Sequence, residues 1–181
     1  MPLILKIIVL FLALIAGLTD IRTRRIPNWL VITGFVLGIA LNSFLFEWAG
    51  LKSSLYGAGL AFAIYFVFYA LRAMGAGDVK LMAAIGAIVG PRLWLIIFFF
   101  TAIAGGVIAL VLLLAKGRLK RTLLNVSIML HQLGHFHAPY QATEELDVRS
   151  GKALRLAHGA TIALGTIVYL AADALQQRPL H

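Results

Sequence analysis

The sequence contains no cysteine among its 181 residues. A chain without thiols forms no disulfide, offers no thiolate to zinc and has no thiol nucleophile, so several enzyme classes are excluded. Charged residues are also scarce, at 13% of the chain, whereas 61% are hydrophobic and the mean hydropathy is +0.94. This apolar content exceeds what a soluble domain of this length buries. We therefore expect a single membrane-embedded domain over residues 1–181.

Apolar runs long enough to cross about 30 Å of hydrocarbon recur along the chain. Because lipid offers the backbone no hydrogen-bond partner, each run is expected to be helical, and the predicted fold class is all-α. Basic residues follow the first run instead of preceding it, so this run is expected to be a retained helix and not a signal peptide. The prediction is a polytopic protein with six transmembrane helices, at residues 3–19, 29–48, 55–73, 78–89, 93–115 and 153–175, and a polar cytoplasmic loop at residues 116–152.

The net charge of +9 comes from basic residues that gather in alternate loops. The first, third and fifth predicted loops carry the excess, whereas the second and fourth hold only Lys52 and Arg92. The positive-inside rule then places the odd-numbered loops in the cytoplasm and both termini outside. We interpret the charge as topological, with the lipid bilayer as its partner, and expect no nucleic acid.

The fourth predicted helix, residues 78–89, is about 12 residues or about 18 Å long, which is too short for the hydrocarbon core. The residues before it, Gly75 to Gly77, are therefore expected to form an unwound turn inside the membrane boundary, with Asp78 starting the helix. Irregular backbone at that depth is tolerated only where protein or a watery cavity covers it. A cavity on the cytoplasmic side is predicted.

Asp20 and Asp78 carry the candidate chemistry. Of the seven acidic residues, only these two fall on the same side, each at the cytoplasmic end of an apolar helix. Ionisable groups at membrane depth are costly and indicate function by default. Two carboxylates in close approach hold one proton between them. One can then deprotonate a water that attacks a peptide carbonyl while the other protonates the developing oxyanion, without metal, cofactor or covalent intermediate.

Each aspartate also has a purely structural interpretation. Asp78 fits a helix N-cap, and Asp20 could form a solvated ion pair with Arg22, Arg24 or Arg25. Their coincidence on one side, beside a glycine turn that needs a cavity, favours catalysis. Two other functions remain open at this point. One is a small proton- or cation-coupled transporter that uses both aspartates, which inverted repeats would favour; the other is a non-catalytic assembly factor.

Three histidines in the long loop, His131, His135 and His137, have a spacing that can share a metal on a helix. Loop histidines without further ligands are more often solvated. No metal site is predicted.

Two motifs resemble those of the type IV prepilin peptidases. The run Asp20-Ile-Arg-Thr-Arg-Arg-Ile-Pro27-Asn28 is similar to the first-aspartate motif of that family. The run Gly75-Ala-Gly77-Asp78-Val-Lys80-Leu is similar to its second motif, the Gly-x-Gly-Asp signature that names the GxGD intramembrane aspartyl proteases. Residues 158–165 are more loosely similar to the last helix of the family.

The resemblance implies a GxGD aspartyl protease fold and an aspartic-type endopeptidase. Members cleave the leader of prepilin or pseudopilin precursors after a glycine, at the cytoplasmic face of the bacterial inner membrane, and serve type IV pilus assembly and protein secretion. Asp20 and Asp78 map onto the two catalytic aspartates. The other motif residues are expected to shape the site or contact substrate: Gly75, Gly77, Lys80, Pro27 and Asn28.

One departure from the larger family members is informative. Those members carry a cytoplasmic methyltransferase insert with paired cysteines, whereas here the first loop is short and cysteine is absent. The chain therefore resembles the peptidase-only form found with tight-adherence (Flp) pilus systems. Neither N-methylation of the product nor a cofactor is expected.

Overall fold

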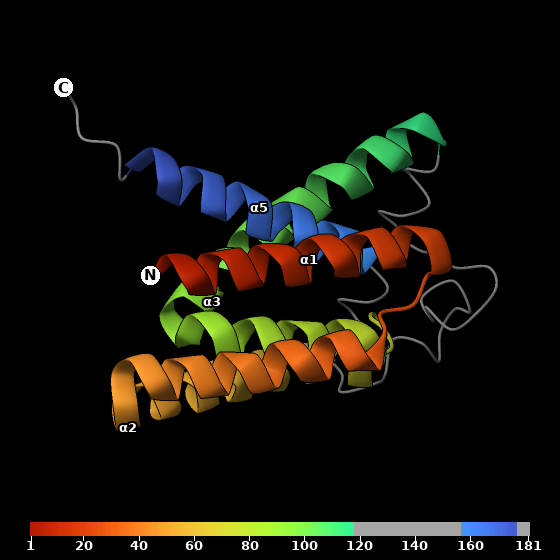
Figure 1. The fold of residues 1–181 in the computed structure, drawn as a ribbon. Helices are drawn as coiled ribbons and strands as arrows, with labels where there is room; N and C mark the ends of the chain where they lie inside the picture. Colours follow the sequence, from red (N-terminus) through yellow and green to blue (C-terminus); the bar gives the residue numbers. More distant parts are fainter. Residues whose placement is uncertain (118–156, 177–181) are drawn as a thin grey trace, which may run out of the picture.

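The computed structural model describes residues 1–117 and 157–176, and these residues form four α-helices and no strand. The helices are α1 (Leu3–Thr23), α2 (Asn28–Ala70), α3 (Ala76–Ala115) and α5 (His158–Gln176) (Figure 1). All four are long and apolar enough to cross a membrane. The predicted all-α class is confirmed. Most of the predicted loop at residues 116–152, and residues 153–156 of the last predicted helix, lie outside the described residues.

Two of the helices reverse direction at a single non-helical residue. In α2 this residue is Glu47, with φ 52° and ψ −134°, and in α3 it is Gly90, with φ 77° and ψ 172° (Figure 1). Across the α2 reversal, the Ser54 hydroxyl donates a hydrogen bond of 3.3 Å to the carbonyl oxygen of Gly38, so the two arms lie side by side. We refer to residues 28–46 and 48–70 as the arms of α2, and to residues 76–89 and 91–115 as the arms of α3.

These reversals correct the predicted helix boundaries. The sequence predicts separate helices divided by loops at residues 49–54 and 90–92, whereas the structure continues the helix on both sides of Glu47 and Gly90. One residue in the left-handed region is enough to turn the chain, and a glycine reaches that region without steric cost. The described chain therefore forms four helices, two of them bent, in place of six separate ones.

The unwound turn predicted at Gly75 to Gly77 is also wrong. Only Gly75 is extended, at φ −82° and ψ 154°, and it caps α3, which begins at Ala76. The preceding connection spans residues 71–75. The first helix is longer than predicted as well, because α1 continues through Thr23. Asp20 therefore lies within a helical turn and not after it.

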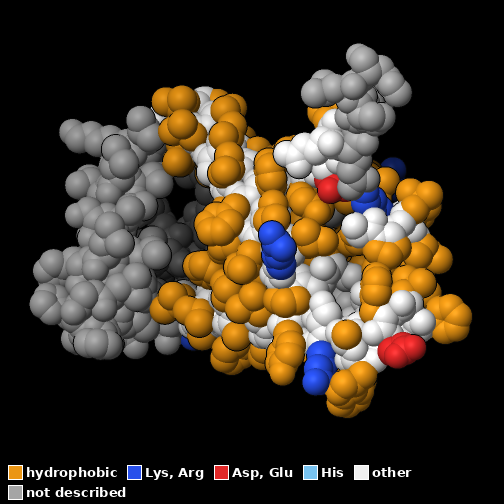
Figure 2. All heavy atoms as spheres, turned by 90° about the vertical axis from the view of Figure 1, so that its left-hand side faces the viewer, with side chains coloured by type: hydrophobic (Ala, Val, Ile, Leu, Met, Phe, Trp, Pro, Cys, Tyr) orange, Lys and Arg blue, Asp and Glu red, His pale blue; other side chains and the backbone are white. Residues whose placement is uncertain are grey.

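The first arm of α3 forms the centre of the bundle. Its side chains Leu81, Met82, Ile85 and Ile88 are fully buried, and α2, α1 and α5 all contact α3. The outer surface has the opposite character: Phe44, at 84% exposure, stands for a large set of exposed hydrophobic side chains. One face of the molecule is accordingly covered mainly by hydrophobic side chains (Figure 2). Helices that are apolar on all sides are typical of membrane spans.

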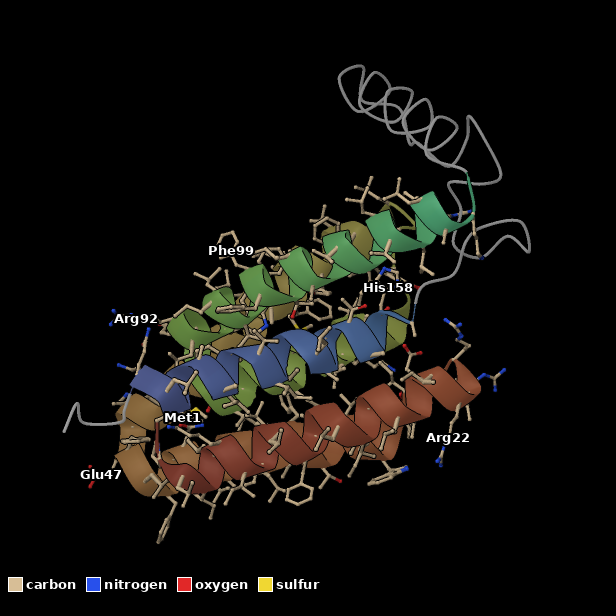
Figure 3. The ribbon with its side chains drawn as sticks, turned by 90° about the horizontal axis from the view of Figure 1, so that it is seen from above. Met1, Arg22, Glu47, Arg92, Phe99 and His158 are labelled. Carbon is tan, nitrogen blue, oxygen red and sulfur yellow. The ribbon has the colours of Figure 1, made fainter. Side chains whose placement is uncertain are left out.

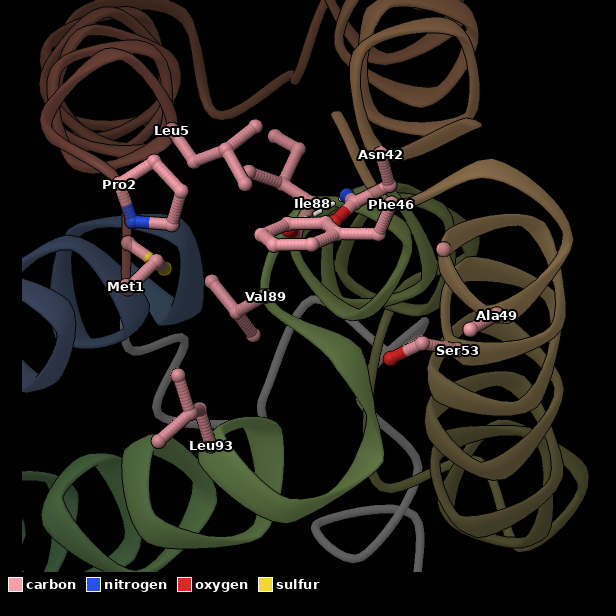
Figure 4. A pocket seen from close by; sticks show the side chains of 11 residues that line it. Met1, Pro2, Leu5, Asn42, Phe46, Ala49, Ser53, Ile88, Val89 and Leu93 are labelled. Carbon is pink, nitrogen blue, oxygen red and sulfur yellow. Dashed lines mark hydrogen bonds between the residues drawn. The ribbon is translucent and has the colours of Figure 1, made fainter. Parts of the chain in front are cut away.

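The reversal in α3 is stabilised by polar side chains from α2. Pro91 has no N–H, so it cannot donate to the carbonyl oxygen of Ala87 four residues earlier. That oxygen instead accepts hydrogen bonds from the Ser54 hydroxyl at 2.7 Å and from Asn42 Nδ2 at 3.2 Å, and Asn42 Nδ2 also lies 2.9 Å from the carbonyl oxygen of Ile88. Asn42 lines a pocket of about 310 Å³ at this end of the bundle, beside Ile88 (Figure 4). Backbone acceptors that a bend exposes are thus satisfied from a neighbouring helix, as a bilayer requires.

The bundle has two distinct ends. Met1, Glu47 and Arg92 lie at one end, and Arg22 lies at the other (Figure 3). The α5 helix begins near the Arg22 end and runs antiparallel to α1, because Lys6 Nζ near the start of α1 forms an ion pair of 2.6 Å with Asp173 Oδ2 near the end of α5.

Gly57 packs against the backbone of α3, and we expect a methyl group there to destabilise the fold. A Cβ added at Gly57 would collide with the carbonyl oxygen of Gly86, whereas a Cβ added at Gly59 would meet nothing within 4 Å. Gly57→Ala should cost about 1–3 kcal/mol through overpacking, measured as a lower midpoint of thermal unfolding in detergent. Gly59→Ala is the matched control and should unfold like the wild type. Equal midpoints for the two variants would contradict this packing.

Candidate active site

A pocket of about 400 Å³ lies between the C-terminal end of α1 and the N-terminal end of α3. It is the type of cavity that the sequence predicts beside Asp78. Both aspartates line it, and so do four of the five predicted site-shaping residues. Pro27 does not line the pocket and is instead the extended N-cap residue of α2. The lining residues are Asp20, Arg24, Arg25, Ile26, Asn28, Gly75, Ala76, Gly77, Asp78 and Lys80.

Asp78 is the third residue of α3 and is only 8% exposed. Its Oδ2 accepts a hydrogen bond of 3.2 Å from the backbone N–H of Gly75. The N-cap interpretation is therefore corrected in position: Gly75 is the cap residue, and the Asp78 carboxylate reaches back to it as in one half of a capping box. A carboxylate here also lies at the positive end of the helix dipole. This structural role engages one carboxylate oxygen.

Asp20 lies in the last turn of α1 and is 7% exposed, so it does not form the solvated surface pair considered above. Its Oδ2 accepts a hydrogen bond of 2.8 Å from the backbone N–H of Gly159. Gly159 is the second residue of α5, where amides have no acceptor within their own helix. Sequence reasoning missed Gly159 as a site residue. The only signal was its place in the run at residues 158–165, since nothing local connects it to a residue 139 positions earlier.

The two carboxylates share one pocket, so they lie within range of electrostatic interaction, and His158 lies within the same range of Asp78. His158 is the first residue of α5 and lines a second, largely apolar pocket of about 340 Å³ between α2, α3 and α5. Met74 lines the same pocket, and the next residue, Gly75, lines the pocket of the aspartates. Consecutive residues of the connection between α2 and α3 thus line the apolar pocket and the polar pocket.

Lys80 and Asn28 join α3 to the start of α2. Lys80 Nζ donates a hydrogen bond of 3.2 Å to Asn28 Oδ1, and both side chains are exposed. The contact closes one wall of the pocket, and neither residue is hydrogen-bonded to an aspartate. Such a contact fits a residue that shapes the site without taking part in proton transfer.

No group of three histidine or acidic side chains that could hold a metal occurs within residues 1–117 and 157–176. The histidines at positions 131, 135 and 137 lie outside the described residues. The expectation of a metal-free site therefore stays a prediction.

The family model described as type IV leader peptidase matches residues 7–110, which is more than half of the 181 residues and includes both aspartates. The chain belongs to this family. A prepilin leader peptidase/N-methyltransferase of Bacillus subtilis (strain 168) is 32% identical over 103 residues, which make up 55% of this chain and 40% of that relative. The chain thus spans less than half the length of the relative. No solved structure matches it.

Membership of the type IV leader peptidase family confirms the resemblance inferred from the two aspartate motifs. Together with four helices suited to crossing a membrane, it identifies the chain as a multi-pass membrane protein of a peptidase family.

Gly77 lines the pocket without any steric need to be glycine, so we expect Gly77→Ala to fold normally. An added Cβ would lie 3.4 Å from Ile26 Cβ, which is ordinary contact, and alanine is favoured over glycine in a helix by about 1 kcal/mol. The midpoint of thermal unfolding should be unchanged or higher. Gly38→Ala is the control, because its Cβ would lie 2.9 Å from the backbone of Ala87 and should lower the midpoint. A clear loss of stability in Gly77→Ala would show that the helix start is packed more tightly than described.

Proposed function

We propose that this chain is an intramembrane aspartic endopeptidase that removes the leader peptide of type IV prepilin or pseudopilin precursors, with Asp20 and Asp78 as the catalytic pair. The observation that carries the proposal is the meeting of two buried carboxylates, from different helices, in one pocket. Family membership and the name of the Bacillus subtilis relative, a prepilin leader peptidase/N-methyltransferase, support the substrate class.

The pocket supports a mechanism in which the two carboxylates share one proton. The ionised member takes a proton from a water molecule, whose oxygen attacks the peptide carbonyl, and the protonated member donates its proton to the oxyanion. Return of a proton to the amine breaks the C–N bond and leaves a carboxylic acid and an amine. Each aspartate has Oδ2 engaged by a backbone amide, which leaves Oδ1 for these transfers. The residues supply this chemistry without a cofactor.

One polar pocket and one apolar pocket, lined in part by consecutive residues, suit a substrate with two parts. A prepilin precursor has a polar leader followed by an apolar helix, and the bond to be cut lies near their junction. The apolar helix would lie toward the pocket lined by Phe98 and Ile162, and the leader would enter the pocket of the aspartates. Gly75 and Gly77 present no side chain there, so an extended substrate backbone can approach Asp78 closely.

We infer six membrane crossings, made by α1, the two arms of α2, the two arms of α3 and α5, in the bacterial inner membrane. The reversals at Glu47 and Gly90 support this count. Arg22, Arg24 and Arg25 gather at the pocket end, so the positive-inside rule places the aspartates at the cytoplasmic face.

The connection between α1 and α2 supports a peptidase-only activity of the type that serves Flp pilus systems. The first helix ends at Thr23 and the second begins at Asn28, so residues 24–27 leave no room for a methyltransferase insert at this point.

Asp20→Asn and Asp78→Asn should each lower the rate of prepilin cleavage by about 10²–10⁴-fold, because each variant removes one of the two proton-transfer groups. The rate is measured with purified protein and a candidate prepilin, and the N-terminus of the product is determined by mass. Asp173→Asn is the control: this acid pairs with Lys6 at the other end of α5 and should leave the rate near wild type. Cleavage that persists in either of the first two variants would rule out the shared-proton mechanism.

The proposed orientation can be tested without background labelling, because the chain contains no cysteine. Thr23→Cys and Gly77→Cys should react with a small polar thiol reagent from the cytoplasmic side. Ser53→Cys should react from the opposite side, because Ser53 lines the pocket at the far end of the bundle (Figure 4). Labelling of Ser53→Cys from the cytoplasm would invert the topology and the proposed cleavage face with it.

A further inference from the structure

The contact between Gly159 and Asp20 joins the start of α5 to a proposed catalytic carboxylate. The amide donates at 2.8 Å to Asp20 Oδ2, and the bond is buried. A Cβ added at Gly159 would lie 2.9 Å from Asp20 Cβ and 3.1 Å from Asp20 Cγ. A position this crowded accepts no side chain unless Asp20 or the helix moves. Gly159 therefore combines two properties: a spare amide aimed at the carboxylate, and the absence of atoms that would displace it.

We propose that Gly159 is a positioning residue, whose amide holds Oδ2 of Asp20 so that Oδ1 faces Asp78 and the water between them. This inference rests on the proposed peptidase function. Misplacement of a reacting group by about 1 Å can reduce a rate by about 10²-fold, so a fixed donor at this carboxylate has a direct kinetic effect. Asp20 alone, in the last turn of α1, has no such restraint within its own helix.

The packing of α5 on α1 keeps this amide in place. Near the site, Gly17 of α1 faces Ala163 closely enough that an added Cβ would lie 2.8 Å from Ala163 Cβ. The Gly159 amide is thus set by the packing of two helices and not by a loop. The ion pair between Lys6 and Asp173 lies at the far end of α5 and is not needed for this position.

Three basic side chains share the pocket with Asp20, and all three are long and exposed, so they orient it less well: Arg24, Arg25 and Lys80. Of the two other ionisable groups nearby, Asp78 is a buried carboxylate and His158 is the half-buried first residue of α5. A backbone amide has one direction and no rotamers, which makes it the most rigid donor in this set.

Two replacements at position 159 distinguish the effect of losing the N–H donor from the effect of adding a side-chain atom. Gly159→Ala keeps the N–H and adds the crowding Cβ. Glycolic acid at position 159, introduced by nonsense suppression in a cell-free system, replaces the backbone N–H by an ester oxygen, so it removes the donor and adds no side-chain atom. The missing N–H costs α5 no hydrogen bond of its own, because an amide in the first turn has no acceptor within its helix. The ester carbonyl of His158 remains an acceptor, and a weaker one than the amide carbonyl.

The matched control is Gly165→Ala, six residues further along α5, where an added Cβ would crowd Thr101 of α3. Both alanine variants should lower the midpoint of thermal unfolding. Only Gly159→Ala should also lower kcat for prepilin cleavage, by about 10-fold or more beyond the control. The glycolate variant should lower the midpoint by no more than Gly165→Ala does, because it loses one buried hydrogen bond. Its KM should stay within about twofold of the wild type while kcat falls about 10-fold, which is the effect of about 1.4 kcal/mol at the transition state. A purely structural contact would not lower kcat alone.

If the wild type cleaves prepilin and the glycolate variant has the same kcat, the positioning role is overturned and the proposed function stands. Equal losses of kcat in Gly159→Ala and Gly165→Ala, with an unimpaired glycolate variant, would have the same meaning. If the wild type itself cleaves no prepilin, the proposed function fails, and the positioning role fails with it. Should Gly159→Ala not fold, the glycolate variant still decides the question, because it retains the native shape.

Discussion

Carboxylates buried among apolar helices need hydrogen-bond donors, and in a helical membrane protein the spare donors are the amides of the first turn of each helix. Both aspartates of this chain meet the requirement in this way. Asp78 takes the amide of Gly75 at the start of α3, and Asp20 takes the amide of Gly159 at the start of α5. The pocket therefore has to lie where two helices begin and a third ends. The paths of α1, α3 and α5 all follow from that condition.

At the opposite end of the bundle, backbone acceptors and not carboxylates need hydrogen-bond partners. There the reversal of α3 leaves carbonyl oxygens without amide partners, and donors have to be brought to them. Asn42 and Ser54 of α2 supply these donors at Ala87 and Ile88. At one end, backbone amides at helix starts donate to the two carboxylates. At the other end, backbone carbonyl oxygens accept from a side-chain amide and a hydroxyl. The close glycine contacts between α2 and α3 allow the bonds at the reversal to form in a tightly packed core.

The sequence predicts the helical class and the apolar segments well, because hydropathy and the needs of the backbone in lipid are local properties. It predicts the aspartate pair for the same reason, since each lies in a compact motif. The reversal at Glu47 could not be predicted, because no sequence pattern marks a glutamate whose φ is positive. The unwound turn was wrong since one extended residue, Gly75, suffices to start α3. Gly159 was missed because its partner is defined only when α1 and α5 pack together.

The bond between Asp20 and Gly159 also has a consequence for biogenesis. The carboxylate is synthesised 139 residues before the amide that receives it, so during translation α1 enters the bilayer with Asp20 unpartnered. A nascent chain that has inserted α1, α2 and α3 already contains both aspartates but lacks the helix that orients one of them. On the proposed function, the two acids therefore reach their final geometry only after α5 has been inserted.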